Sequence, residues 1–398
     1  MRAAKLITIR ALQSSAVAEP EPCSVIGPIQ LLILQPTPFC NIDCRYCYLP
    51  NRSETRTMDL GTVLETATRI AEEGLLGESI TIVWHAGEPL TLPKQFYVDA
   101  ISGIRGRIPA STVVRHTVQT NGTLLNDGWC ELFAAHGVRV GLSLDGPQSI
   151  HDAARITRSG KGTFTRVMRG LELLRDRNIP YYVLAVLTAA SLQHADKMFE
   201  FFRSNNVPEV GFNVEEIEGI HLVSSLTREF ALTFRQFMSA FYSRCAADPG
   251  APRIREFRQL EGFLLNGSLS KTRPLQQLTP YRILSVDCDG GFSTFSPELL
   301  GMKGPPASDY TLGNIHTDGL RNALTSPKFN SIYSSLMRGV SMCREGCDYF
   351  GLCGGGSPSN KISEHGTLEA TETLHCFLRI KQLTEVVLVK LEERYGLR

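Results

Sequence analysis

Three cysteines, Cys40, Cys44 and Cys47, stand close together just after an apolar segment near the start of the chain. Thiolates are soft ligands that suit iron–sulfur clusters, and a four-iron cubane needs four ligands. The C-x3-C-x2-C spacing supplies three, so one iron is left open for another ligand. A zinc site would add a nearby fourth Cys or His, which the adjacent sequence lacks. The segment therefore predicts an iron–sulfur cluster with one open iron.

A second set of cysteines lies near the end of the chain. Its members are Cys343, Cys347, Cys353 and Cys376. Three glycines at residues 354–356 would let the backbone pass close to a bulky inorganic group. Four thiolates ligate a four-iron cluster completely, and such a cluster suits electron transfer or structural stapling. Zinc is the open alternative, because the spacing does not exclude it.

Composition sets the broad class of the protein. The chain has 398 residues, of which 42% are hydrophobic and 20% charged, so we expect a sizeable core and no wholesale disorder. A net charge of +1 argues against a dedicated nucleic-acid binder. The eleven cysteines are odd in number and clustered, which favours metal ligation over disulfides.

Targeting signals are not evident. Arg10 interrupts the apolar stretch near the N-terminus before it reaches the length of an export signal. No run of eighteen apolar residues occurs, so we expect neither a transmembrane helix nor a membrane partner. The expected location is the cytoplasm.

The elements that must position the cysteines begin at about residue 30. Strands are expected at residues 31–34, 80–84, 113–119, 138–144, 181–187 and 210–214, and helices at residues 60–73, 95–105, 127–136, 164–177 and 195–204. Strands this rich in Val, Ile and Leu suit a parallel sheet buried on both faces. Six strand–helix repeats predict an α/β fold, either a parallel barrel or an open doubly wound sheet. The chemistry should lie where strands end and helices begin.

Changes in composition divide the chain into four parts. Residues 1–29 are expected to be a flexible lead-in, and residues 30–220 form the α/β core. Residues 221–285 are a helical bridging region. Residues 286–398 form a small, loop-rich, metal-stapled domain that ends in a closing helix at residues 377–395.

The first cysteine segment, with Tyr46 before its third cysteine, resembles the signature of radical S-adenosylmethionine (radical SAM) enzymes. The resemblance implies a partial (β/α)6 barrel of the TIM type. It also implies a [4Fe-4S] cluster on Cys40, Cys44 and Cys47, whose open iron chelates the amino and carboxylate groups of SAM. One electron then cleaves the sulfonium and gives a 5′-deoxyadenosyl radical.

Further motifs of that family follow in order along the chain. Residues 86–89 resemble the GGEP motif with Ala in place of the first Gly, and residues 143–147 resemble the SLDGP segment. The resemblance assigns SAM binding to Tyr46, Gly87, Glu88, Asn121, Ser143, Asp145 and Arg155. A guanidinium fork suits the carboxylate of SAM. Taken singly, Asp145 also reads as an ordinary turn residue and Arg155 as a solvated charge.

The C-terminal cysteine region resembles the SPASM domain, the auxiliary-cluster extension of radical SAM peptide maturases. It departs from that pattern at Ser296 and Ser357, where cysteines are expected, and in its opening C-x3-C. Cys288 alone cannot hold another cluster. The resemblance therefore supports one auxiliary [4Fe-4S] cluster, on Cys343, Cys347, Cys353 and Cys376.

Residues 288–301, 312–315 and 353–361 narrow the resemblance to the cyclophane-forming maturases of Gly-rich-repeat (GRRM-type) precursor peptides. It implies an enzyme that abstracts a side-chain hydrogen and links that carbon to an aromatic ring. The partners would be a small Gly-rich precursor peptide and a one-electron reductant of the flavodoxin or ferredoxin type. The auxiliary cluster would take an electron.

A carboxylate would take the proton that such a reaction releases. Glu215 and Glu216 are the candidates, and Glu218 follows them. These three side chains follow the sixth expected strand, at the end of the barrel where chemistry is expected. For at least two of the three, we favour the alternative of a solvated loop.

Two other functional classes remain open. A thioether-forming or sulfatase-maturase-like enzyme would oxidise a side chain of a peptide or protein, but a sulfatase maturase usually keeps a second auxiliary cluster, against which Ser296 and Ser357 count. A non-enzymatic iron–sulfur electron carrier would not need Glu88, Ser143 and Arg155. In either maturase class, a leader peptide would dock on the bridging region.

Overall fold

The computed structural model describes residues 26–265 and 276–396. Most of the expected lead-in, with Cys23, lies outside the described residues. A ten-stranded sheet in the order β10-β9-β8-β1-β2-β3-β4-β5-β6-β7 forms the centre of the molecule. Its strands are β1 (Leu31–Leu34), β2 (Ser79–Trp84), β3 (Val113–Thr120), β4 (Arg139–Ser143), β5 (Tyr181–Leu187), β6 (Glu209–Val214), β7 (Arg253–Ile254), β8 (Ile283–Val286), β9 (Gly291–Thr294) and β10 (Gly313–Asn314).

Helices alternate with the strands and then dominate the C-terminal third. They are α2 (Leu60–Glu72), α3 (Lys94–Arg105), α4 (Asp127–His136), α5 (Gln148–Ala154), α6 (Phe164–Asp176), α7 (Ala195–Ser204), α8 (Ala231–Ala247), α9 (Arg255–Leu265), α10 (Leu320–Ala323), α11 (Pro327–Gly346), α12 (Phe350–Cys353), α13 (Pro358–His365) and α14 (Leu383–Arg394). A π-helical segment, Cys376–Gln382, precedes α14. In the described part of the chain, no helix combines the length and hydrophobicity that a membrane span requires.

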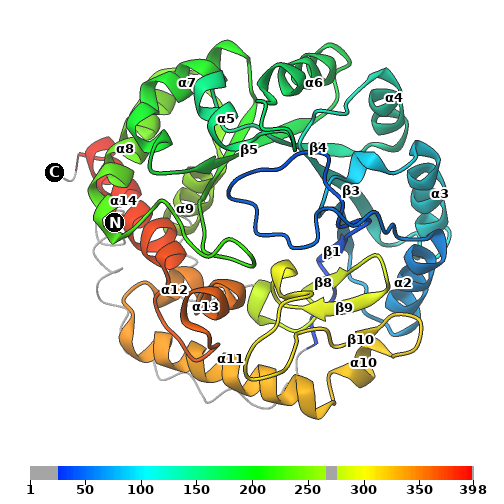
Figure 1. Ribbon diagram of the computed structural model, residues 1–398. Helices are drawn as coiled ribbons and strands as arrows, with labels where there is room; N and C mark the ends of the chain where they lie inside the picture. Colours follow the sequence, from blue (N-terminus) through cyan, green and yellow to red (C-terminus); the bar gives the residue numbers. More distant parts are fainter. Residues whose placement is uncertain (1–25, 266–275, 397–398) are drawn as a thin grey trace.

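The strands curve into a ring with α2, α3, α4, α6 and α7 on its outside (Figure 1). All pairings from β8 through β1 to β7 are parallel, whereas β9 and β10 are antiparallel. The six expected strands and five expected helices are present, with boundaries that differ by no more than one residue at either end. The parallel α/β fold is confirmed, and the carboxyl ends of β1–β6 meet at one end of the ring.

Local sequence signals fix where the main helices begin. Asp59 precedes α2, and its carboxylate accepts a hydrogen bond from the backbone N–H of Thr62 at 2.6 Å. Ser326 caps α11 in the same way, because its hydroxyl accepts from the N–H of Phe329 at 3.1 Å. Such caps satisfy backbone donors that have no partner within the helix.

Residues 221–285 connect the core to the C-terminal part and contribute strands as well as helices. Phe237 and Phe241 of α8 pack edge-on against Phe212 of β6, with ring centroids 5.6 and 5.0 Å apart. Edge-to-face aromatic pairs of this kind stabilise a buried interface beyond the area they cover. They hold α8 against the outer face of the sheet.

The C-terminal part joins the same sheet. β8 pairs in parallel with β1, with Leu31 opposite Ile283 and Leu34 opposite Val286. In Figure 1 the orange α11, α12 and α13 close the ring between α14 and β9. The second set of cysteines is therefore tied to the strand from which the first cysteine segment departs.

Candidate active site

The first cysteine segment follows β1 and crosses the middle of the ring (Figure 1, blue). Cys40, Cys44 and Cys47 are free and partly buried. Burial raises the pKa of Cys40 to about 12 and that of Cys44 to about 11. Thiolates at these positions need nearby positive charge, which the iron of a cluster supplies. The three thiols fit the predicted cluster.

Two of the predicted SAM-binding side chains reach these thiols. Asn121, which directly follows β3, points its amide Nδ2 at Cys40 Sγ, 3.8 Å away. Arg155 follows α5, and its Nη1 lies 4.0 Å from Cys44 Sγ. The structure thus brings side chains that follow β3 and α5 to the cysteine segment that follows β1.

Asp145 and Arg155 form a buried pair that also holds Tyr46. The Nε and Nη2 atoms of Arg155 each donate to the Asp145 carboxylate at 3.1 Å, and the Tyr46 hydroxyl donates to the same carboxylate. The guanidinium carbon lies 5.4 Å from the centre of the Tyr46 ring. Asp145 is 1% exposed and Arg155 is 7% exposed, so neither is the turn residue or solvated charge of the alternative interpretation.

Glu88 is 1% exposed at the end of β2. Its carboxylate accepts from the N–H groups of Leu90 and Asn121 at 3.0 and 2.8 Å, and from the hydroxyl of Thr120 at 2.7 Å. Burial raises the pKa of Glu88 to about 7, although these hydrogen bonds oppose the shift. Glu88 therefore ties the loop after β2 to the end of β3.

The loop before Glu88 is tightly constrained. Gly87 has φ +55°, and a Cβ there would lie 2.4 Å from the carbonyl oxygen of Phe39, so no larger residue fits. Ala86 has φ +78°. This is the left-handed region, which favours glycine over residues with a Cβ. The departure from GGEP therefore places strain next to the cysteine segment.

A cavity of about 430 Å³ opens beside the Asp145–Arg155 pair. Tyr46, Asp145 and Glu215 line it together with Val186 and Thr188 from the end of β5. A volume of this size suits a small organic ligand. Ser143 does not line it; its hydroxyl accepts instead from Gln119 Nε2 at 3.0 Å. The SAM-binding roles of all seven residues stay predictions: Tyr46, Gly87, Glu88, Asn121, Ser143, Asp145 and Arg155.

The second set of cysteines gathers at the ends of α11 and α12 and the start of the π-helical segment. Cys343, Cys353 and Cys376 are 6–7% exposed, and Cys347 is partly buried. Burial, together with the neighbouring thiols of Cys353 and Cys347, raises the pKa of Cys376 to about 12. In residues 26–265 and 276–396, no three His, Cys, Asp or Glu side chains form a group suited to a single metal ion.

Lys361 of α13 gives an independent indication of what this second site holds. It is 0% exposed, and it interacts electrostatically with Cys343, Cys353 and Cys376. Among residues 26–265 and 276–396, its Nζ finds no hydrogen-bond partner. A buried, unpartnered ammonium needs negative charge nearby. A thiolate-ligated iron–sulfur cluster supplies that charge, so the residues fit the predicted auxiliary cluster.

Carboxyl groups collect between the two cysteine sites. Glu216 accepts from His375 Nδ1 at 2.7 Å and from Asn360 Nδ2 at 2.6 Å. Glu218 and Glu298 lie nearby, and burial together with the neighbouring carboxylates raises the pKa of both, that of Glu298 to about 7. The solvated-loop alternative is wrong, because Glu215 and Glu218 are only 8% and 6% exposed.

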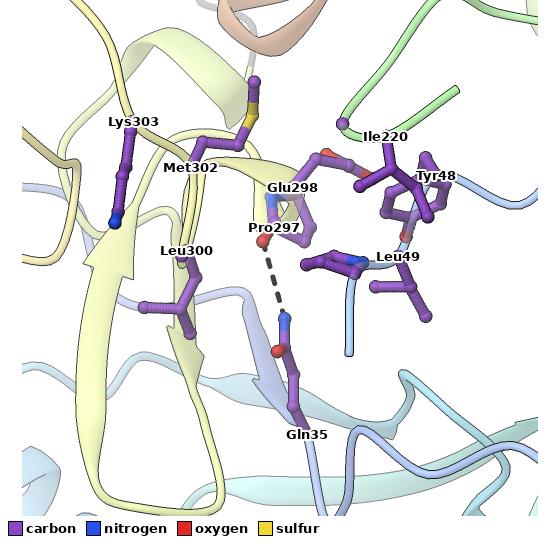
Figure 2. A pocket seen from close by; sticks show the side chains of 12 residues that line it. Gln35, Tyr48, Leu49, Ile220, Pro297, Glu298, Leu300, Met302 and Lys303 are labelled. Carbon is purple, nitrogen blue, oxygen red and sulfur yellow. Dashed lines mark hydrogen bonds between the residues drawn. The ribbon is translucent and has the colours of Figure 1, made fainter. Parts of the chain in front are cut away.

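Glu298 also lines a second cavity of about 220 Å³. Figure 2 shows it between Leu300 and Met302 on one side and Ile220 and Tyr48 on the other. Gln35 closes one edge by donating to the carbonyl oxygen of Pro297 at 3.5 Å. Sequence reasoning assigned no role to Glu298 or Lys361, although they lie in the motif segments 288–301 and 353–361, because those segments do not show which distant side chains the two residues meet.

Comparison with known proteins decides the family. A protein-family model described as "Radical SAM superfamily" matches residues 34–202 of this chain. A Synechocystis protein named sll1766, described as uncharacterised, is 41% identical over 376 residues and covers 93% of this chain and 94% of its own length. The chain belongs to the radical SAM superfamily. The resemblance of the first cysteine segment to this superfamily is thus confirmed.

Relatives of named activity and solved structures agree with this family. A serine-type anaerobic sulfatase-maturating enzyme of Bacteroides thetaiotaomicron is 25% identical over 362 residues, which are 84% of each chain. The structure of anSMEcpe with bound AdoMet and Cp18Cys peptide matches with a TM-score of 0.75 at 22% identity, covering 92% of this chain and 100% of that one. The match supports the radical SAM fold with a SPASM-like C-terminal part.

The family membership makes this protein a radical SAM enzyme. The predicted cofactors agree with it: SAM, a SAM-binding [4Fe-4S] cluster and an auxiliary [4Fe-4S] cluster. A simple electron carrier would not need the buried Asp145–Arg155 pair and the adjoining cavity. That alternative is set aside.

Proposed function

We propose that this radical SAM enzyme is a maturase that modifies side chains of a peptide or protein. The support is the similarity to a sulfatase-maturating enzyme and to a maturase fold with a bound peptide. The motifs in residues 288–301, 312–315 and 353–361 support a narrower proposal, a carbon–carbon cyclophane crosslink in a small Gly-rich precursor peptide.

One observation carries this proposal: a carboxyl cluster stands between the two cysteine sites. Tyr48, next to Cys47, interacts electrostatically with Glu298 and Glu218. On the other side, Glu216 binds His375, which is next to Cys376. A crosslink to an aromatic ring must release one hydrogen atom, one electron and one proton, and these three parts of the site could each receive one of them.

At the first site, Cys40, Cys44 and Cys47 would hold the cluster and the 430 Å³ cavity would hold SAM. Bound there, SAM supplies the radical that removes a hydrogen atom from a substrate carbon. Arg155 would bind the SAM carboxylate through Nη1, because its Nε and Nη2 are already committed to Asp145. Asp145 is then the residue that fixes the guanidinium in position.

Proton acceptance is proposed for the carboxyl cluster. Glu298 lines the cavity in Figure 2, and its pKa of about 7 suits a general base at neutral pH. Glu216 is held by two hydrogen bonds, and His375 contributes to lowering its pKa against the effect of burial. Glu215 accepts from His221 and Ser225 and lines the first cavity instead. Glu215 and Glu216 stay candidates that the same experiments test.

The second site would receive the electron. Cys343, Cys347, Cys353 and Cys376 would hold the electron acceptor, and the peptide loses two hydrogens in all: one as an atom, one as a proton with a separate electron. An external flavodoxin- or ferredoxin-type reductant and a cytoplasmic location complete the proposal. A leader peptide is proposed to dock on residues 221–285.

The deciding experiment is a mass measurement. The enzyme is co-expressed with a short Gly-rich peptide encoded beside its gene, and Cys40→Ala serves as the inactive control. A loss of two hydrogens per modification, with no reaction toward aldehyde reagents and missing backbone fragments between the linked residues, supports the crosslink.

A product that reacts as an aldehyde at a Ser or Cys supports a sulfatase-maturase-like oxidation, the function that the named relatives favour. An unchanged peptide mass, with SAM cleavage confirmed, contradicts the Gly-rich substrate.

A further inference from the structure

Lys361 has an environment that neither packing nor the proposed SAM chemistry explains. Its side chain is 0% exposed, and its Nζ donates no hydrogen bond within the described part of the chain. Leaving an ammonium buried without a partner is costly, and removing such a charge is often neutral or stabilising. A buried lysine of this kind therefore indicates a negatively charged group at its end.

Two glycines lie against this side chain, and the tighter of them, Gly339, makes room for its end. Its Cε lies 3.7 Å from the position that a Cβ would take at Gly356, three residues after Cys353. Its Nζ lies 3.0 Å from the corresponding position at Gly339, one helical turn before Cys343 on α11. The end of the Lys361 side chain therefore lies between α11, which carries Cys343, and the glycine segment that follows Cys353.

Lys361 differs from Lys381, the other lysine described near this site, in whether a carboxylate compensates its charge. Lys381 also interacts with Cys347 and Cys376, but it forms an ion pair with Glu372 and lies 5.8 Å from the ring centre of Tyr349. Lys361 has no carboxylate partner in the part of the chain that the structure describes, and it interacts electrostatically with Cys343, Cys353 and Cys376. Its positive charge is therefore available to whatever those thiols bind.

We propose that Lys361 tunes the auxiliary cluster, acting as its buried counter-charge and raising its reduction potential. This inference rests on the proposed function, which places an electron acceptor on the second set of cysteines. Reduction adds one negative charge to a cluster, and a fixed cation in a low-dielectric interior stabilises that form more than the oxidised form. Lys361 thus acts on electron transfer through its charge, and this role involves no contact with the peptide.

The test measures the reduction potential of the auxiliary cluster in the full-length chain. Cys40→Ala, Cys44→Ala and Cys47→Ala are combined, so that only the second site contributes a signal, and the protein is reconstituted anaerobically with iron and sulfide. An electron paramagnetic resonance titration then compares Lys361 with Lys361→Met, which keeps the length and removes the charge. We expect at least a tenfold change in the one-electron equilibrium, which is about 59 mV toward lower potential.

Lys381→Met is the matched control. It removes a lysine that already has a carboxylate partner, so a clearly smaller shift is expected. Lys361→Gln is a second neutral variant that guards against a folding defect in Lys361→Met. An unchanged potential in a variant that retains its iron overturns the proposal. Loss of the iron from both neutral variants also overturns it, because the role would then be in assembly.

The outcome is separable from that of the proposed function. The titration needs no peptide, so a wrong substrate leaves it unaffected. A wild-type chain that binds zinc and no iron at the second site overturns the role of Lys361, whatever the peptide assay shows. A normal potential shift with an unmodified peptide supports Lys361 and rejects the substrate alone.

Discussion

The two cysteine sites differ in access and in charge. The first has three partly buried thiols on a loop, next to a cavity of about 430 Å³ and an arginine that Asp145 neutralises. The second has four thiols, three of them almost fully buried, next to a lysine that nothing in the described chain neutralises. The first site is built to admit an exchangeable ligand, and the second is built to exclude one and hold charge.

The strongest test of this difference between the two sites is to replace one cysteine in each of them. Cys40→Ala is expected to abolish both 5′-deoxyadenosine formation and peptide modification, because the SAM-binding cluster loses a ligand. Cys353→Ala is expected to keep SAM cleavage and lose the modified peptide, because only electron acceptance is damaged. Chromatography of both products under anaerobic reduction gives the result.

Cys130→Ala is the control for that pair, since Cys130 is a buried thiol of α4 outside both sites. It should leave both products close to wild type. Full peptide modification by Cys353→Ala would mean that the electron leaves by another route.

Between the two sites, Glu298→Gln is expected to slow peptide modification by about 10²- to 10⁴-fold, with SAM cleavage retained, because the general base is lost. The pKa of Glu298 is raised to about 7 by burial and by Glu216, so the carboxylate that accepts a proton predominates only above that pH. The wild-type rate should therefore rise with pH through about 7 and then level off. The variant should lack this rise.

Glu215→Gln and Glu216→Gln provide matched comparisons for that measurement. Each removes one charge from the same loop after β6. If one of them shows the largest loss and abolishes the pH dependence, the proton acceptor is that residue and not Glu298.

A smaller effect is expected from changing the charge balance of each site in the apo chain. Asp145→Asn leaves Arg155 buried without its counter-ion, and the free energy of unfolding should fall by about 3 kcal/mol or more. Lys361→Met should be neutral or stabilising, because that ammonium has no hydrogen-bond partner among the described residues to lose. Denaturant titration of apo protein measures both.

Arg177→Gln is the control, because it breaks an exposed pair with Asp127 and should cost less than about 1 kcal/mol. If Lys361→Met lowers the free energy of unfolding as much as Asp145→Asn does, the two sites do not differ in charge balance.

The smallest change in stability is expected from a substitution next to the first cysteine site. Ala86→Gly relieves a left-handed backbone conformation at a gain of about 1 kcal/mol, from which the greater freedom of glycine in the unfolded chain subtracts part. The denaturation midpoint should rise slightly. A lower midpoint would show that the Ala86 methyl group contributes packing that outweighs the strain.

The sequence predicted the core well because its signals are local. Apolar runs defined β1 and β5 to the residue, and the motif residues Glu88 and Asp145 lie at strand ends, as parallel topology requires. The exact roles of such residues were less accessible. The SAM contact of Asp145 stays a prediction, and the structure adds that its carboxylate oxygens hold Arg155, Tyr46 and the backbone of Val186, contacts that the motif does not show.

Interactions between distant segments could not be predicted. Glu216 meets Asn360 and His375 across 144 and 159 residues of sequence. Lys361 lies in a polar stretch whose composition indicates a surface loop, yet it is fully buried. Its burial depends on the path of α11 past α13, which no local pattern encodes.

The parallel pairing of β8 with β1 has a consequence for the evolution and engineering of this enzyme. Four ladder positions align the strand that leads into the second cysteine region with the strand that leads into the first, so the backbone holds the starts of the two regions side by side. A linker of variable length could not do so. If the C-terminal region were exchanged or truncated before β8, one edge of β1 would lose its partner strand. Such an unpaired edge can pair with another chain, so the protein would be prone to aggregate. Recombination that keeps this edge intact should place no junction between β1 and the second set of cysteines, so that the two regions are inherited as one unit.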